Sequence, residues 1–229
     1  MKRCVILFTL LFSLHFAKAQ TIVLQKENTT RGKENFGPNL KNYTQFYFTI
    51  GMLASPDFAG ARVKHGGSLE LGFGLRQKYK VGSVYSWGWL IAYEYQAYEL
   101  KQEDGKLLPS AQTFDEQRID ISYGYLGLFN RFNFDPSRGN TIGKFFEFGV
   151  RGKYALSASE IQKYKVPSGN AQTEISGLKY FRDWQADVYA QLGRGHFSIW
   201  GAWRLTELLH SSYNYPKLPY LTVGIELGF

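Results

Sequence analysis

The sequence predicts an all-β protein, an eight-stranded antiparallel transmembrane up-and-down β-barrel with a polar, side-chain-filled lumen. Three observations lead to this fold class: a signal peptide at the start, eight segments that alternate apolar and polar residues, and an alternating last segment that ends at Phe229. Aromatic residues make up 17% of the chain, yet the mean hydropathy is only −0.29. These values are typical of a membrane barrel, because apolar residues occupy only one face of each strand.

The first 19 residues have the layout of a secretory signal peptide. Lys2 and Arg3 precede an apolar run that ends at Phe16, and residues 17–19 form a small-x-small cleavage site. The apolar run is too short to span a membrane comfortably. Cys4 is removed with this segment, so we expect no disulfide or thiol chemistry in the mature chain.

Residues 20–43 follow as a polar N-terminal periplasmic arm, and residues 44–229 form the barrel. The arm has one short apolar start and no clear period. We expect it either to be flexible or to fold into the mouth of the barrel.

Four alternating segments lie in the first half of the chain. Each has an apolar face that we assign to the outside of the barrel. In the fourth segment the phase blurs at Leu126 and Leu128, which a β-bulge would explain. The segments and their outward faces are 45–52 (Phe46, Phe48, Ile50, Met52), 68–77 (Leu69, Leu71, Phe73, Leu75), 84–98 (Tyr85, Trp87, Trp89, Ile91, Tyr93, Tyr95) and 118–132 (Ile119, Ile121, Tyr123, Tyr125).

Four more segments complete the predicted ring, each near the length of a tilted membrane strand. They are 144–156 (Phe146, Phe148, Val150, Tyr154), 183–193 (Trp184, Ala186, Val188, Ala190, Leu192), 196–206 (Phe197, Ile199, Trp203, Leu205) and 221–229 (Leu221, Val223, Ile225, Leu227, Phe229).

Short and long connections alternate between these segments, as in outer-membrane barrels with periplasmic turns and external loops. The short connections carry the Gly, Asn, Asp or Pro residues that turns require. An even number of strands then places both termini in the periplasm. The short connections are 78–83, 135–143 and 193–196, and the long ones are 54–67, 100–117, 157–179 and 208–219.

A soluble, lipocalin-like barrel of eight strands is the main structural alternative. It would turn the apolar residues inward and the charges outward. The Trp and Tyr residues at the strand ends favour a lipid environment, because their rings suit the membrane interface.

The stretch from about Tyr43 to Phe229 resembles the outer-membrane β-barrel domain family that includes PorT-type and other small eight-stranded outer-membrane proteins. The likeness rests on "QFYFTIGM" at 45–52, "ISYGYLGLFNRFNF" at 121–134 and "LTVGIELGF" at 221–229. The resemblance implies the barrel fold, and it implies that Phe229 is a C-terminal signal for the outer-membrane assembly machinery. PorT-type members take part in secretion, a role that these residues do not carry over.

The inward phase of the strands collects charges of both signs. Eight strands enclose a space just wide enough for side chains, so we expect the charges to pair into a closed plug. A proton or ion path is the functional alternative. The predicted lumen charges are Glu70, Arg76, Glu94, Asp120, Glu147, Arg151, Lys153, Asp183, Asp187, Arg204 and Glu226.

The net charge and the motifs of the chain indicate which binding partners and cofactors to expect. The net charge is +8, and removal of Lys2, Arg3 and Lys18 with the signal lowers it by three, to +5. Basic loop residues such as Lys163 and Lys165 either attract lipopolysaccharide phosphates or are ordinary solvated charges. We expect no nucleic acid, since the chain is exported. We also expect no cofactor or metal, since no phosphate-binding glycine loop and no cysteine-based metal site appears.

One group of residues could form the catalytic site of an enzyme. His210 and Ser212 have the His-x-Ser spacing of PagL-type lipid A deacylases, which they resemble over a handful of residues, and Glu226 could be the acid by sequence order. The resemblance implies an Asn directly after the serine, but Tyr213 intervenes. Glu226 also lies near the predicted periplasmic end, far from an external loop.

The sequence therefore predicts a non-catalytic, integral outer-membrane barrel with a structural, adhesive or envelope-complex role. Its expected partners are outer-membrane lipid and lipopolysaccharide, the assembly machinery and proteins of an envelope complex. A lipid A-modifying hydrolase is the alternative, and a narrow porin is a third option.

Overall fold

A computed structural model describes residues 36–54 and 58–229 of the chain. The predicted signal peptide with Cys4, and the predicted arm as far as residue 35, lie outside the described residues. Among the described residues, no helix is long and apolar enough to cross a membrane. The described residues form one 3₁₀ turn, η2 (Ser211–Tyr213), and nine strands: β1 (Asn42–Leu53), β2 (Leu69–Lys80), β3 (Tyr85–Leu100), β4 (Glu116–Asn133), β5 (Lys144–Val166), β6 (Gly169–Ser176), β7 (Trp184–Arg194), β8 (Phe197–Arg204) and β9 (Leu221–Gly228).

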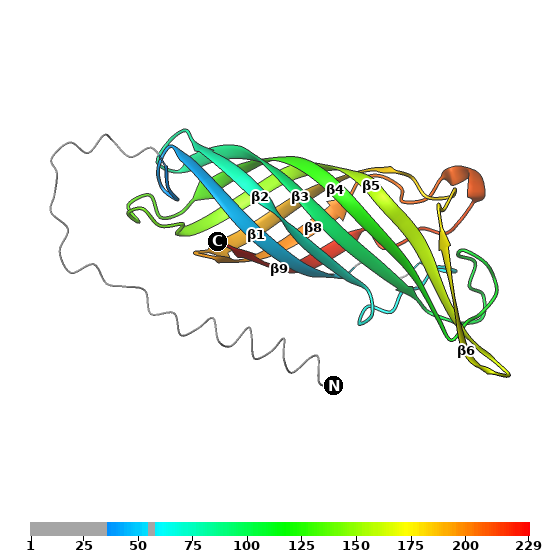
Figure 1. Cartoon of the computed structure of the whole chain (residues 1–229). Helices are drawn as coiled ribbons and strands as arrows, with labels where there is room; N and C mark the ends of the chain where they lie inside the picture. The colour runs from blue at the N-terminus through cyan, green and yellow to red at the C-terminus, as the bar shows by residue number, and fades with distance from the viewer. Residues whose placement is uncertain (1–35, 55–57) are drawn as a thin grey trace. The chain divides into compact units, whose positions relative to one another are not determined.

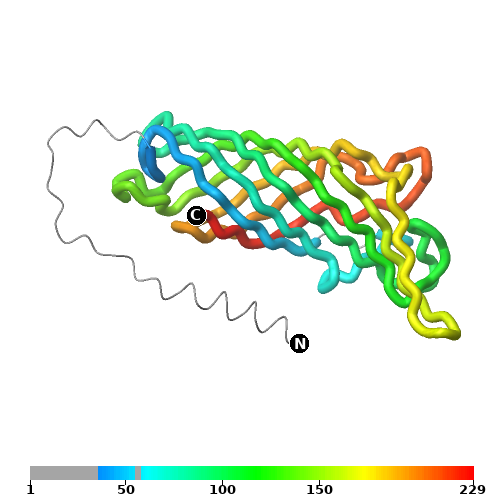
Figure 2. Tube along the Cα trace, viewed as in Figure 1, coloured from blue at the N-terminus to red at the C-terminus, as the bar shows by residue number. Residues whose placement is uncertain are grey.

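Eight of these strands close into an antiparallel barrel (Figure 1 and Figure 2). Neighbours pair in the order β1-β2-β3-β4-β5-β7-β8-β9, and β9 pairs back onto β1 with Gly228 opposite Tyr47. The predicted fold class is confirmed in its strand number, its antiparallel pairing and its closure. A closed ring has no open edge, which removes the unpaired backbone groups of an edge strand.

The two ends of the barrel differ in their connections. The terminal end, where β1 begins and β9 ends, holds the turns at 81–84, 134–143 and 195–196. The opposite end, called the loop end below, holds the longer connections. The predicted alternation of short turns and long loops is confirmed.

One predicted loop is in fact largely strand. Residues 157–179 contain the last part of β5 and all of β6, which form a hairpin with Val166 opposite Gly169. β6 pairs only with β5, so it lies outside the ring and projects beyond the loop end (Figure 1). Sequence pattern missed it because this hairpin is polar on both faces and has no alternating apolar signal.

Side chains alternate between the lumen and the outside along the barrel strands, with one break at the bulge of β5. On β9, Thr222 and Glu226 are buried, whereas Ile225 and Leu227 are 41% and 45% exposed. The soluble alternative placed the apolar side chains inside, and they lie outside. We call this exposed apolar surface the outer belt; it consists of Phe46, Phe48, Ile50, Leu71, Phe73, Leu75, Trp87, Trp89, Ile91, Leu126, Leu128, Phe148, Val150, Val188, Leu192, Ile199, Ile225 and Leu227.

The predicted phase of the fourth strand was wrong. Ile119, Ile121 and Tyr123 on β4 point into the barrel and are fully buried, whereas Leu126 and Leu128 point outward. The alternation runs unbroken through β4. The inward face of this strand is apolar near the loop end, so apolarity alone could not say which face meets the outside.

The β-bulge lies in the neighbouring strand instead. Ser122 of β4 stands opposite Ser157 of β5, and the next residue, Tyr123, stands opposite Ala155. Leu156 is therefore the extra residue, and the bulge falls where β5 leaves β7 and continues towards β6.

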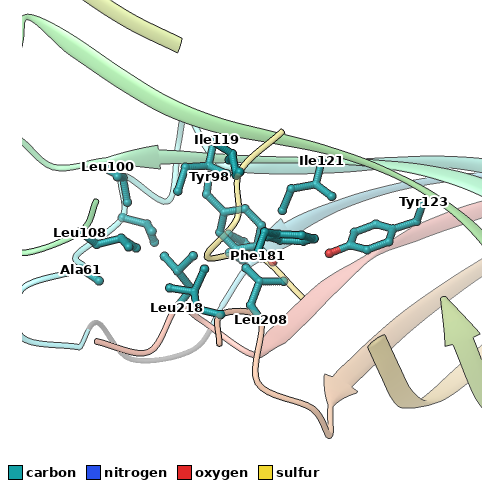
Figure 3. Close-up of a cluster of buried hydrophobic side chains, with 14 residues drawn as sticks. Ala61, Tyr98, Leu100, Leu108, Ile119, Ile121, Tyr123, Phe181, Leu208 and Leu218 are labelled. Atoms are coloured by element: carbon teal, nitrogen blue, oxygen red, sulfur yellow. The ribbon is translucent and has the colours of Figure 1, made fainter. Parts of the chain in front are cut away.

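The loop end is filled by a hydrophobic core (Figure 3). Loop segments fold inward and bury their apolar side chains against the inner faces of β1, β3 and β4. The lumen is consequently apolar here and polar nearer the terminal end. We call this core the loop-end plug; it consists of Leu53, Ala61, Val63, Tyr98, Leu100, Leu108, Ile119, Ile121, Tyr123, Leu178, Phe181, Leu208, Leu209 and Leu218.

The terminal end is crossed by the segment that leads into β1. The side-chain amide of Asn39 donates to the carbonyl of Gly139 at 2.7 Å, and its backbone N–H donates to Asn140 at 3.2 Å. Lys80 in turn donates to the carbonyl of Asn39 at 2.9 Å. Of the two predicted arrangements for the arm, this described part folds against the barrel mouth.

Candidate functional site

A buried carboxylate organises the charges of the lumen nearest the terminal end. Glu147 on β5 lies between two guanidinium groups, with Arg131 Nε at 2.6 Å and Arg76 Nε at 3.2 Å. Arg76 also binds both carboxylate oxygens of Glu226, at 2.7 and 2.9 Å. The hydroxyl of Tyr189 donates to Glu147 at 2.9 Å. This cluster joins β2, β4, β5, β7 and β9 across the lumen.

A second cluster lies closer to the loop end. Arg151 binds both carboxylate oxygens of Asp187, at 2.6 and 2.8 Å. Lys153 bridges Asp187 at 2.8 Å and Glu94 at 2.6 Å. Because each charge is nearly completely buried, two acids and two bases compensate one another at a place where an unpaired charge would be costly.

Amides and hydroxyls extend this second cluster toward the plug. Gln96 donates to Glu70 and to Glu94, both at 2.8 Å. The hydroxyl of Tyr98 donates to Gln96 at 2.9 Å and accepts from Arg204 at 3.1 Å. Polar groups thus continue until the hydrophobic core begins.

The lumen is filled by these side chains. Between them lie a cavity of about 20 Å³ beside Lys153 and Asp187 and another of about 10 Å³ beside Arg76 and Tyr47. Cavities of this size hold about one water each. The geometry favours the predicted salt-bridged plug over the ion path.

Two predicted lumen charges lie elsewhere. Asp120 is on the outer face of β4 and pairs with Arg118 at 2.7 Å, because the phase of that strand is opposite to the predicted one. Asp183 is exposed and precedes β7, which begins at Trp184. The other nine predicted lumen charges line the lumen as expected, with Arg204 at its loop end.

Sequence reasoning missed four buried charges among the described residues, which are Lys78, Lys106, Arg131 and Glu160. Arg131 was missed because the predicted phase of β4 was wrong. Lys78 was assigned to a turn, although it is the tenth residue of β2, and it donates to the carbonyl of Pro38. Glu160 lies on the part of β5 that was read as a loop. Correct boundaries of β2 and β5 would have identified Lys78 and Glu160, and the correct phase of β4 would have identified Arg131. Lys106 lies in a loop, where no strand pattern applies.

Glu160 belongs to a polar network at the loop end that fastens loop 101–115 to the barrel wall. Gln117 donates to Glu160 at 2.6 Å, and Tyr180 donates to it at 3.1 Å. Lys106 reaches in from the loop to Gln117 and, at 3.0 Å, to Gln102. Burial lowers the pKa of Lys106, and burial with the nearby Glu160 carboxylate raises the pKa of Tyr180.

The residues of the hydrolase alternative are not brought together around one acid. His210 and Ser212 are exposed at the loop end, where Ser212 lies within η2. Glu226 lies in the lumen, and both its oxygens accept from Arg76. The nearer acid, Glu207, pairs with Lys217 at 2.6 Å.

Phe229 lies at the terminal end beside the first strand. Its backbone N–H donates to the carbonyl of Phe46 at 2.7 Å, and its side chain is 63% exposed. The phenyl ring of Phe229 is therefore accessible to a receptor without opening of the barrel.

Within residues 36–54 and 58–229, no group of three or more His, Cys, Asp or Glu is arranged to hold a metal ion. A comparison with known proteins found no matching protein-family model and no similar curated protein.

Proposed function

We propose that this chain is an integral outer-membrane β-barrel, non-catalytic, with a structural, adhesive or complex-subunit role in the cell envelope. The single observation that supports this proposal is the outer belt on a closed barrel whose lumen is ion-paired. In water, such a belt would leave a continuous apolar surface around the whole molecule. In a bilayer, the same surface meets acyl chains, and the closed ring leaves no unpaired backbone group in the hydrocarbon.

Aromatic pairs border the belt at both ends of the barrel and support the proposal. Near the terminal end, the rings of Tyr79 and Trp87 lie 5.2 Å apart. Near the loop end, the rings of Tyr154 and Trp184 lie 4.9 Å apart. Amphipathic rings of this kind prefer the two membrane interfaces.

A passive or partner-binding role fits the filled lumen better than conduction does. The charge clusters occupy the polar part, and the loop-end plug occupies the remainder. The β5–β6 hairpin projects past the barrel and offers a surface to a neighbouring envelope protein (Figure 1). In a narrow porin, both the charge clusters and the loop-end plug would have to move to open a path.

We orient the barrel with its short turns on the periplasmic side, so the terminal end faces the periplasm and the loop end faces outward. Phe229 then meets the assembly machinery on the periplasmic side, and the basic residues of the loop end meet lipopolysaccharide. The PorT-type resemblance is compatible with a subunit role, and co-purification from mildly solubilised envelopes tests it.

Fractionation of the envelope tests the location. The mature chain is expected in the outer-membrane fraction, and unheated samples should migrate differently on a denaturing gel from boiled ones. A soluble chain that does not shift on heating would contradict the proposal.

A further inference from the structure

We propose that the free edge of β6 binds an extended segment of another protein at the cell surface, which adds to the hairpin as a further strand. β6 pairs only with β5, so its second edge has no strand partner among the described residues. We call this second edge the β6 edge. The inference rests on the proposed function and specifies how the projecting hairpin meets its partner, because the proposed orientation holds the hairpin outside the membrane (Figure 1 and Figure 2).

The register of the hairpin determines which backbone groups point to the β6 edge. The backbone N–H of Asp115 donates to the carbonyl of Lys163 at 2.9 Å, so Lys163 directs its backbone groups to the β4 side of β5. Facing residues of an antiparallel pair either bond each other or both turn away. Gln172 faces Lys163 and therefore directs its own N–H and C=O to the β6 edge. Asn170 and Glu174, two positions to either side, do the same.

β6 lacks most of the features that protect a free edge from pairing. Protected edges are short, or they carry lysine, proline or a bulge. β6 is eight residues long, contains neither lysine nor proline, and keeps an unbroken register with β5 from Ser176 to Gly169. Asn170, Gln172 and Glu174 are exposed. Unpaired donors and acceptors along such an edge form the template to which an extended peptide bonds.

The side chains on the two faces of β6 determine the chemistry of the partner. Ile175 is 42% exposed and shares one face with Ala171 and Thr173. Glu174 lies on the other face and has no ion-pair partner among the described residues. An added strand alternates its own side chains between the same two faces. We therefore expect a segment with apolar residues beside Ile175 and a basic residue beside Glu174.

A second copy of this chain fits the β6 edge less well than a different protein does. Two copies in one membrane project their hairpins in the same direction, so their β6 strands run parallel (Figure 1). Parallel pairs are less stable per residue than antiparallel ones. Glu174 would also face a strand that has no basic residue.

A fluorescently labelled peptide tests the β6 edge on the refolded mature barrel in detergent. The probe is a peptide in which valines alternate with Thr, Lys and Thr, and the control peptide has Glu in place of Lys. Fluorescence anisotropy measures binding, with empty micelles as the blank. Gln172→Pro removes one outward N–H and keeps the pairing with β5, whereas Gln172→Ala removes only the side chain. Glu174→Lys reverses the single charge of β6.

We expect the wild-type barrel to bind the lysine peptide more tightly than the glutamate peptide. Gln172→Pro should weaken binding by about tenfold, Gln172→Ala should match the wild type, and Glu174→Lys should reverse the preference between the peptides. Glu174→Pro replaces Gln172→Pro if that variant does not fold. Equal binding by Gln172→Pro and Gln172→Ala, or no binding of either peptide, would overturn the β6 edge as a binding surface. Equal binding of both peptides would overturn the charge assignment.

Amide hydrogen exchange locates the bound peptide residue by residue. The lysine peptide should slow exchange at Asn170, Gln172 and Glu174 and leave Ala171 and Thr173 unchanged, because the latter two direct their N–H groups to β5. The same change at all five amides would overturn the proposal. Slow exchange at the first three without peptide, increasing with protein concentration, would identify a second copy as the occupant and overturn the choice of partner.

The heat-dependent gel shift is recorded on the same samples. A shifting barrel that binds no peptide overturns the β6 edge and leaves the proposed function standing. A soluble chain that does not shift overturns the proposed function itself.

Discussion

Two lysines on β5 allow a buried and an exposed ion pair to be compared within one strand. The side chain of Lys153 is 5% exposed and contacts Glu94 and Asp187, at 2.6 and 2.8 Å. The side chain of Lys163 is 44% exposed and pairs with Glu116 at 2.7 Å. We predict that Lys153→Met lowers the free energy of unfolding by about 3–5 kcal/mol, because it leaves two carboxylates sharing one remaining base. Lys163→Met should cost less than about 1 kcal/mol.

Urea titration in detergent, followed by tryptophan fluorescence, measures both values. Equal effects of the two substitutions would mean that the charges of the lumen are solvated like those of the hairpin.

Ser212 tests the hydrolase alternative at the level of one hydroxyl. Activation of a serine needs a base within hydrogen-bond reach and an acid to orient that base. Glu226 is held by Arg76 in the lumen. We therefore predict that Ser212→Ala leaves the lipid A acylation pattern of the host unchanged. Loss of an acyl chain on overexpression, reversed by Ser212→Ala, would favour the hydrolase.

The charges of the lumen were predictable where the strand phase was clear. Arg76 and Glu226 lie on strands whose apolar outer face is unambiguous. Because side chains alternate along a strand, both residues had to point inward. Asp120 was misplaced because β4 has apolar residues on both faces: on its inner face near the loop end and on its outer face nearer the terminal end. The pairings themselves could not be read from one sequence, because they depend on the register between strands.

At the scale of elements, β4 offers a direct test of strand phase. Leu128 is 58% exposed on the outer belt, whereas the sequence pattern had left its side ambiguous. We predict that Leu128→Arg destabilises the barrel in lipid vesicles by about 2–4 kcal/mol, since the charge must enter the hydrocarbon. Leu128→Met is the control and should be nearly neutral. Refolding titrations measure both, and a harmless Leu128→Arg would mean that this face does not meet lipid.

The loops of the plug can be tested with two adjacent leucines. Leu108 is fully buried in the loop-end plug, whereas Leu107 is 57% exposed. We predict that Leu108→Ala costs about 2–5 kcal/mol of local stability and frees loop 101–115 from the barrel mouth. Leu107→Ala should have little effect.

Trypsin reports this opening, because cleavage after the buried Lys106 requires the loop to leave its site. Faster cleavage in Leu108→Ala than in Leu107→Ala is expected, with the barrel still intact on unheated gels. Identical rates would show that the plug does not hold the loop.

The elements that the sequence predicted are those with one apolar and one polar face. β1, β2, β7 and β9 have this pattern along nearly their whole length. β6 has neither face apolar, and its stability comes from the hairpin pairing with β5. The plug was also hidden, because its apolar residues are scattered over loops whose folding depends on the completed ring.

For the whole molecule, closure was predictable because eight alternating segments with alternating short and long connections leave few other arrangements. The outward direction of the apolar faces gives the closed ring its membrane character in our account. The same barrel in water would expose the entire outer belt.

The contact between the outer belt and lipid is the central claim, and site-directed spin labelling tests it most directly. Cys4 is the single cysteine and falls in the predicted signal peptide, so each mature variant carries one label. Labels at Ile199, Ile225 and Leu227 of the outer belt, in vesicles, should relax strongly with oxygen and weakly with a water-soluble nickel complex. A label at Lys165, exposed on the projecting hairpin, should show the opposite preference. Strong nickel relaxation at all four positions would contradict the account, because the belt would then face water.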